Sequence, residues 1–327
     1  MIITRTPYRV SFVGGGSDLP AYYRQNQGRV VSCAINKHIY ISLHRSFDSS
    51  QTLIRYSKVE KVTNLNDIEH NIIRHVLTKH GVSGVEITCM GDIPTKTGLG
   101  SSSSFTVGLL NAVHTYLGTS KSKVELAEEA SALEIELSNG IIGKQDQYAA
   151  AVGGMNELIF NPDESVEVNR LSIGKGGDKL IQNLTLFFTG ITRDAGAILA
   201  KHSHDIKFSS ESHDRQAQLV AMVADVKQAL EREDMKKFGK LLDASWKLKR
   251  EISKGISSEH IDRLYTDLMK LGCYGGKLLG AGGGGFILAI CTENARDEIS
   301  KQLDVKAIPI SIDYEGTQVI YDDGERK

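Results

Sequence analysis

The amino-acid sequence predicts an α+β protein built from two domains, and three observations support that prediction. The chain has 327 residues, of which 40% are hydrophobic, so it can bury a core large enough for two domains. Strand-like and helix-like segments are mixed along its length. From residue 184 onward, their order is typical of helices covering one face of an antiparallel sheet. We therefore place the first domain at residues 1–180 and the second at residues 181–327.

The first domain is expected to begin with strands. Residues 9–13 alternate in polarity and stop at three glycines, and residues 30–35 and 39–43 have the composition of further strands. A helix is predicted next by apolar residues at helical spacing: Phe105, Val107, Leu109, Leu110, Val113 and Leu117. Ser122 and Glu125 have the spacing of a capping box that opens another helix, which Gly140 ends.

The second domain is expected to begin with a strand at 184–188. Helical patterns follow near 213–232, 234–251 and 259–271, and then come a strand at 286–290, a short helix near 294–303 and strands around 308–312 and 319–321.

Composition excludes several classes of partner. The net charge is −1, so nothing attracts nucleic acid or an anionic membrane in general, and a phosphorylated ligand needs a local set of donors. The four cysteines lack metal spacing and are typical of reduced thiols. Charged residues interrupt the first segment, where a signal peptide needs an apolar centre, and no apolar run has membrane-spanning length. We therefore expect a cytoplasmic protein.

The run from Pro94 to Ser104 is predicted to hold phosphate groups. Its glycines let the backbone curl around an anion, and the helix that follows presents unpaired N–H groups and a positive dipole end. The serines add donors or a magnesium ligand. A Ser/Gly linker would continue into polar sequence instead. The candidate ATP-binding residues in this cradle are Pro94, Gly98, Leu99, Gly100, Ser101, Ser102, Ser103 and Ser104.

Two common nucleotide motifs do not account for this cradle. A Walker loop would end in Gly-Lys-Ser/Thr, which is missing near Gly98. The glycines at 280–285 formally match a dinucleotide fingerprint, but they run directly into a strand instead of a helix. Because so many glycines cost chain entropy, a close backbone approach to a ligand or to the cradle is favoured over a packing role alone.

Three separated blocks of the chain resemble the three motifs of the GHMP kinase superfamily. They are residues 7–18, 94–104 and 275–285, in the order of the family. The resemblance implies an N-terminal α/β domain like the second domain of ribosomal protein S5. It also implies a ferredoxin-like α+β C-terminal domain, with the active site between the two.

The first block departs from the Gly-Glu-His-Thr-Asp pattern of many sugar kinases in this family. It reads Gly14-Gly15-Gly16-Ser17-Asp18, which is similar to the D-glycero-D-manno-heptose 7-phosphate kinases and, less closely, to the L-fucose kinases. Glycines widen the pocket and remove a negative charge, as a longer, phosphate-bearing sugar requires. The resemblance implies an enzyme that uses ATP and Mg²⁺ to phosphorylate the anomeric hydroxyl of such a sugar. Its candidate sugar-binding residues here are Gly15, Gly16, Ser17 and Asp18.

The resemblance also assigns roles to single residues. Ser102 and Glu134 match the family's magnesium ligands, with Ser101 and Ser103 as substitutes that the run of four serines leaves open. Asp146 matches the aspartate that accepts or orients the proton of the attacking hydroxyl, with Arg9 as the cation beside it. Taken alone, Glu134 is typical of a solvated helix glutamate and Asp146 of a helix cap. Glu136 is the alternative ligand if the helical register is shifted. The sequence leaves open whether Asp146 removes the proton or only aligns the hydroxyl.

The receptor for a sugar phosphate is the least determined part of the predicted site. Lys144 and Arg193 both follow turns that contain glycine, although either could equally be a surface charge. Gly282 and Gly283 are the candidates from the third block. His202 and His204 are not expected to bind metal together, because alternate residues face different sides of a helix or a strand.

Two other functions remain open at this stage. Another sugar 1-kinase, acting on L-fucose or a galactose-like sugar, would use the same motifs. A non-catalytic sugar sensor would lack part of the serine loop, which is intact here. The oligomeric state is left open.

Overall fold

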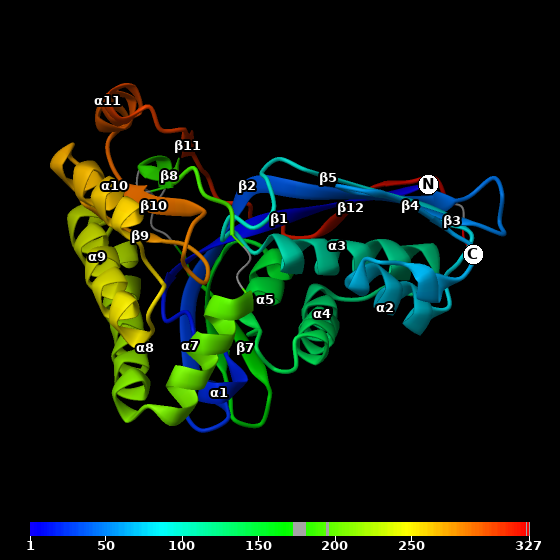
Figure 1. Cartoon of the computed structure of the whole chain (residues 1–327), viewed down its shortest axis with the longest axis horizontal. Coiled ribbons are helices and arrows are strands. Elements are labelled where there is room, and N and C mark those ends of the chain that lie inside the picture. The colour runs from blue at the N-terminus through cyan, green and yellow to red at the C-terminus, as the bar shows by residue number, and fades with distance from the viewer. Residues whose placement is uncertain (173–180, 194–195, 325, 327) are drawn as a thin grey trace.

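The structure is a computed structural model of the chain, and it describes residues 1–172, 181–193, 196–324 and 326. Two sheets organise these residues, one of eight strands and one of four. Figure 1 shows the larger sheet with α2 (Asn71–His80), α3 (Ser101–Tyr116) and α4 (Lys123–Leu137) beneath it, and the smaller one beside the helices α8 (Ser210–Glu231), α9 (Met235–Ile252) and α10 (Glu259–Lys270). The predicted α+β class is confirmed.

The first sheet is built around two long neighbouring strands. Its strands are β1 (Ile2–Val13), β2 (Gly28–Arg45), β3 (Thr52–Arg55), β4 (Val59–Val62), β5 (Val85–Gly91), β6 (Met155–Phe160), β7 (Val166–Arg170) and β12 (Gln318–Asp322). The order is β12-β1-β2-β5-β3-β4, and β6 joins β2 to β7. All of these pairs are antiparallel except β3 with β5.

The two strands expected at 30–35 and 39–43 form the single strand β2. The polar stretch between them does not end the strand, because its backbone stays paired with β1 at His38. The first half of β2 pairs with β6 and the second half with β5.

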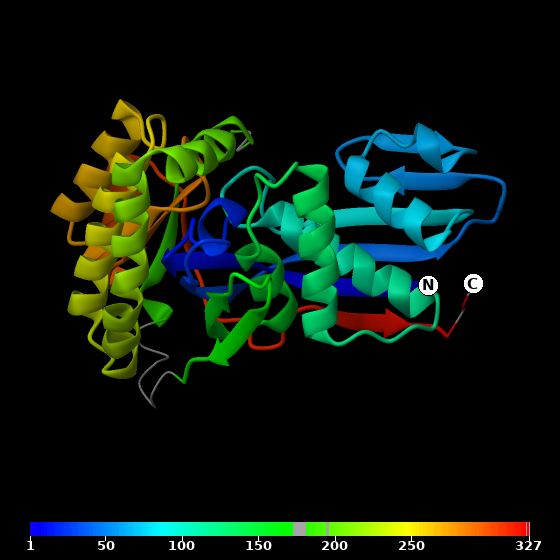
Figure 2. The same ribbon diagram turned by 90° about the horizontal axis from the view of Figure 1, so that it is seen from below.

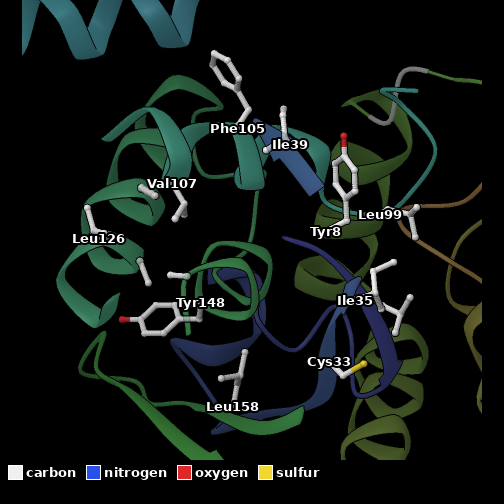
Figure 3. Close-up of a cluster of buried hydrophobic side chains, with 14 of the residues drawn as sticks. Tyr8, Cys33, Ile35, Ile39, Leu99, Phe105, Val107, Leu126, Tyr148 and Leu158 are labelled. Carbon is white, nitrogen blue, oxygen red and sulfur yellow. The ribbon is translucent and has the colours of Figure 1, made fainter. Parts of the chain in front are cut away.

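The helical segments of the first domain are α1 (Pro20–Tyr23), the 3₁₀ turn η1 (Leu65–Asp67), α2 (Asn71–His80), α3 (Ser101–Tyr116), α4 (Lys123–Leu137) and α5 (Gln145–Val152). Of these, α3 and α5 pack on β1 and β2, and α2 and α4 pack on α3. The predicted capping box of α4 is confirmed, since Ser122 Oγ accepts a bond from Glu125 N and the Glu125 carboxylate accepts one from Ser122 N. Figure 3 shows Val107 of α3 and Leu99 in the same buried cluster as Tyr8 and Ile35 of the sheet. This packing fixes the start of α3 against β1.

The second sheet has the order β11-β8-β10-β9 and is antiparallel. Its strands are β8 (Leu184–Phe188), β9 (Gly275–Leu278), β10 (Phe286–Ile290) and β11 (Ala307–Pro309). The helices are α7 (Gly196–Phe208), α8 (Ser210–Glu231), α9 (Met235–Ile252), α10 (Glu259–Lys270) and α11 (Glu293–Leu303). Helices separate β8 from β9 and β10 from β11, which is the βαββαβ arrangement of a ferredoxin-like domain. That expectation is confirmed.

The last strand does not belong to the second sheet, although the sequence predicted it as part of the second domain. β12 pairs with β1, with Ile3 opposite Tyr321 and Thr4 opposite Val319. Its backbone thereby satisfies the free edge of β1. Figure 2 shows the N-terminus and the end of β12 at the same end of the first sheet. The predicted domain boundary after residue 180 lies outside the described residues and stays a prediction.

No helix in the described part of the chain combines the length and the apolar character needed to cross a membrane.

Candidate active site

A cavity of about 780 Å³ brings the three sequence blocks together. Its walls come from β1, the starts of α3 and α5, the helices α4, α7 and α9, and the glycine-rich turn after β9. The predicted site residues that line it are Arg9, Gly15, Gly16, Asp18, Gly98, Gly100, Ser101, Ser102, Ser103, Glu134, Asp146, Arg193 and Gly282.

Two glycines of the cradle, just before α3, have a left-handed backbone conformation. Gly98 and Gly100 have φ values of +83° and +73°, and Gly100 caps α3 without a side-chain hydrogen bond. The first N–H groups of α3, which no helical carbonyl can satisfy, therefore remain for a ligand. A Cβ atom at Gly100 would lie 3.2 Å from the Arg9 side chain, so glycine also permits the arginine to approach.

Three predicted cradle residues shape the loop without lining the cavity. The Leu99 side chain is buried in the core of the first domain. Ser104 Oγ donates to the Pro7 carbonyl at 2.8 Å, and the Pro94 carbonyl accepts a bond from Thr97 Oγ1 at 2.9 Å.

The third glycine block packs directly on the cradle. A Cβ atom at Gly280 would lie 2.5 Å from Gly98 Cα, and one at Gly285 would overlap the Thr97 carbonyl. The predicted close backbone approach is thus confirmed for the cradle. Gly282 lines the cavity, whereas Gly283 packs against Ile198 and Arg193 outside the lining.

Arg9 joins the cradle to Asp146. Its Nε and Nη2 atoms each donate to one carboxylate oxygen of Asp146 at 2.6 Å, and its Nη1 donates to the Gly98 carbonyl at 2.7 Å. The Arg9 side chain is 5% exposed and that of Asp146 is 23% exposed. Asp146 lies in the first turn of α5. The two-bond pair therefore fixes the carboxylate at the edge of the cavity, next to the cradle.

Glu134 is a buried carboxylate surrounded by hydroxyl groups. It accepts hydrogen bonds from Ser102 Oγ and Ser103 Oγ at 2.6 Å each, and also from Thr106 and the Gln147 amide. Burial raises its pKa, and the hydrogen bonds oppose that shift. Among the described residues no cation lies within ion-pair distance of it, and Glu136 is exposed on the same helix.

Asp18 and Ser17 differ in their access to the cavity. Asp18 accepts bonds from Gly16 N at 2.9 Å and Gln145 N at 3.3 Å. Burial, and then the charge of Asp146, raise the pKa of Asp18. Ser17 does not line the cavity, because its hydroxyl exchanges two hydrogen bonds with the Arg29 backbone.

Of the two predicted receptors for a sugar phosphate, only Arg193 lines the cavity. Lys144 Nζ is paired with the Glu164 carboxylate at 2.6 Å, lies 4.7 Å from the centre of the Tyr23 ring, and is outside the cavity lining. Arg193 lines the cavity next to the third glycine block.

Two buried lysines at the cavity were missed by the sequence reasoning. Lys249 of α9 donates to the Gly280 carbonyl, and Lys277 of β9 donates to the Phe12 carbonyl at 3.0 Å. An ammonium has three donors, so each keeps capacity for a ligand. The signal for Lys249 was its place among the residues that α9 buries, which include Leu242, Trp246 and Ile252.

The charges around Lys249 set its protonation. Burial and the nearby Arg9 lower its pKa to about 8, while Asp18 and Asp146 act in the opposite direction. Lys249 also faces His202 and Lys277, and burial lowers the pKa of Lys277 well below its usual value. An anion entering the cavity would favour the charged form of Lys249.

The chain is similar to known proteins over most of its length. The family described as GHMP kinases N terminal domain matches residues 67–154, and GHMP kinases C terminal matches residues 226–307. D-glycero-alpha-D-manno-heptose 7-phosphate kinase of Campylobacter jejuni is 30% identical to this chain and covers 92% of it and 93% of its own length. Galactokinase of Pyrococcus furiosus is 26% identical, with 88% of each chain covered.

A solved structure, a D-glycero-D-manno-heptose 1-phosphate kinase from Bacteroides thetaiotaomicron, shares the fold with a TM-score of 0.79. It is 21% identical and covers 98% of this chain and 100% of its own. This chain belongs to the GHMP kinase family. It is therefore a phosphotransferase that acts on an alcohol group, and ATP is the phosphate donor of that family.

Proposed function

We propose that this kinase phosphorylates the anomeric C1 hydroxyl of D-glycero-D-manno-heptose 7-phosphate, giving the 1,7-bisphosphate used for nucleotide-activated heptose in the cytoplasm. The observation that carries the proposal is the Arg9–Asp146 pair, which a hydrogen bond from Arg9 links to the phosphate cradle at Gly98 and which lines the same cavity as Gly15 and Gly16. The similarity to the Campylobacter jejuni heptose 7-phosphate kinase supports the choice of sugar.

The geometry supports a role for each residue in phosphoryl transfer, which depends mainly on positioning and charge stabilisation. The N–H groups at the start of α3 hold the phosphates of ATP. Asp146 aligns the acceptor hydroxyl, whose oxygen forms a bond to the γ-phosphorus as the bond between that phosphorus and the ADP oxygen breaks, and the hydroxyl proton is released to water. Lys249 and Arg9 offset the negative charge that spreads over the transferred group.

The residues around Glu134 fit a magnesium ion. A buried carboxylate without a cationic partner among the described residues, together with the Ser102 hydroxyl, offers the hard oxygen ligands that Mg²⁺ prefers. Glu134 and Ser102 would hold the ion beside the cradle. The ion would neutralise charge on the β- and γ-phosphates of ATP.

Arg193 is proposed as the receptor for the 7-phosphate, because it lines the cavity while Lys144 is occupied by Glu164. The test is ADP release with a panel of free and phosphorylated sugars, followed by product mass and anomer determination. We expect Arg193→Ala to raise the KM for heptose 7-phosphate about 10- to 100-fold, as loss of a charge-assisted bond implies. Lys144→Ala, the matched control, should leave that KM unchanged.

Two results of the panel would contradict the proposal. Turnover of galactose or L-fucose, with heptose 7-phosphate left unused, would assign the site to another sugar 1-kinase. Turnover of no sugar, with nucleotide still bound, would favour a sensor.

A further inference from the structure

Buried polar atoms without hydrogen-bond partners gather around Gly15 and Gly16. Within the described part of the chain, these atoms are Ser11 Oγ, Gln145 Oε1, His202 Nε2 and Gln216 Oε1. Each of the four side chains belongs to a residue that is at most 9% exposed, and they come from β1, α5, α7 and α8. A buried polar group left unpaired destabilises the folded protein, so four of them in one place indicate a ligand that satisfies them.

The two glycines bring these side chains together. A Cβ atom at Gly16 would lie 2.6 Å from Gln216 Oε1 and 2.9 Å from His202 Cε1. One at Gly15 would lie 3.2 Å from Ser11 Oγ. Any larger residue at Gly16 would therefore displace the histidine or the glutamine.

Three of the four polar residues reach the cavity. Ser11, Gln145 and His202 line it, together with Gly15 and Gly16. Gln216 lies behind the turn, where its Nε2 donates to the carbonyls of Gly14 at 3.2 Å and Gly15 at 3.4 Å. Gln216 thus acts as a positioning residue for the glycine turn.

The chemistry of the three lining residues matches hydroxyl groups. Burial and the charge of Lys249 lower the pKa of His202 to about 3, so its ring is neutral at neutral pH and has one donor and one acceptor nitrogen. A serine hydroxyl both donates and accepts, and a glutamine carbonyl accepts. All three are uncharged, which suits a polyol more than a phosphate.

We propose that Ser11, Gln145 and His202 bind the hydroxyl groups of the acceptor sugar over the Gly15–Gly16 turn and thereby set the choice of sugar. This inference rests on the proposed function, because it takes the acceptor to be a sugar. It assigns part of sugar recognition to α7, an element of the second domain.

The test is the steady-state kinetics of His202→Phe, which keeps a ring of similar size and removes both nitrogens. We expect the KM for the sugar to rise about 10- to 100-fold, since a site built to bond a hydroxyl discriminates strongly when one partner is lost. The KM for ATP and the melting temperature should not change. His204→Phe is the matched control on the exposed side of α7 and should leave the KM for the sugar unchanged.

Ser11→Ala gives a second measurement should the phenylalanine variant fail to fold, and its KM for the sugar should rise about tenfold. KM values for monodeoxy analogues of the sugar then identify the hydroxyl group that His202 binds. For the analogue that lacks it, wild type and His202→Phe should have equal KM values, because the interaction is lost only once.

An unchanged KM for the sugar in both His202→Phe and Ser11→Ala would overturn the inference, as would equal rises in the KM values for sugar and ATP. Neither result affects the proposed function. If the wild-type enzyme phosphorylates no sugar, it is the proposed function that fails.

Discussion

Replacing Asp146 by asparagine tests the centre of the proposed site. The substitution keeps the shape of the side chain but removes its charge, and its amide nitrogen cannot accept a bond from the arginine. One of the two 2.6 Å bonds from Arg9 is therefore lost, while the bond from Arg9 to the Gly98 carbonyl can remain. Because Arg9 still holds the cradle through this bond to Gly98, nucleotide binding should persist.

The expected loss can be estimated from the role of the carboxylate. A side chain that accepts or orients a proton in the transition state contributes about 10²- to 10⁴-fold to the rate. This range corresponds to about 3–5 kcal/mol in the activation free energy. The cost to folding should be smaller, about 1–3 kcal/mol, since Asp146 is partly solvated.

The measurements are ADP release at saturating sugar, nucleotide titration and thermal unfolding. Asp225→Asn is the matched control, because it makes the same change at an exposed position on α8. Near-wild-type turnover in Asp146→Asn would refute the reasoning. Equal loss of nucleotide binding and turnover would show that the carboxylate supports the cradle instead of the acceptor.

Three further predictions concern other parts of the cavity. Glu134→Gln should raise the Mg²⁺ concentration needed for half-maximal activity at least about tenfold, by loss of a charged ligand, while the exposed Glu136→Gln should not. In the proposed mechanism Lys249 acts in its charged form, and its pKa is about 8, so kcat/KM should fall as the pH rises through that value, and Lys249→Arg should move the fall to higher pH. Gly280→Ala should weaken ATP binding by displacing the cradle, measured by titration. Gly118→Ala, at φ +70° with open space around it, adds similar backbone strain alone, so equal effects of the two would contradict the packing argument.

Local sequence patterns predicted the cradle. Which basic side chains line the cavity depends instead on contacts between residues that are distant in the sequence. The glycines and serines of the cradle act through their own backbone and the helix that follows, so neighbouring residues contain the signal. Lys144 precedes Asp146 by two residues, but residues at that spacing do not share a helix face, and Lys144 contacts Glu164 instead. Lys249 reaches the site through the carbonyl of Gly280, thirty-one residues away, and no spacing rule predicts such a contact.

Contacts between distant residues also explain why the extent of β2 and the sheet of β12 were predicted wrongly. The pattern around residues 36–38 indicated a break, yet β2 continues: its pairing with β1 shifts register there and is present on both sides, at Ala34 and at His38. The place of β12 depended on the free edge of β1, which lies more than 300 residues earlier in the chain.

Glycines at this site do more than bend the backbone, because each leaves room for a specific group from elsewhere in the chain. Gly100 admits the Arg9 side chain, Gly280 admits the backbone at Gly98, and Gly16 admits His202 and Gln216. The three glycines of the first block present no side chain to a sugar, and the unpaired polar atoms near them come from Ser11 of the same block and from α5, α7 and α8. If Gln145 and His202 bind the sugar as proposed, substitutions on α5 and α7 should change the preferred sugar while the glycines of the first block stay the same.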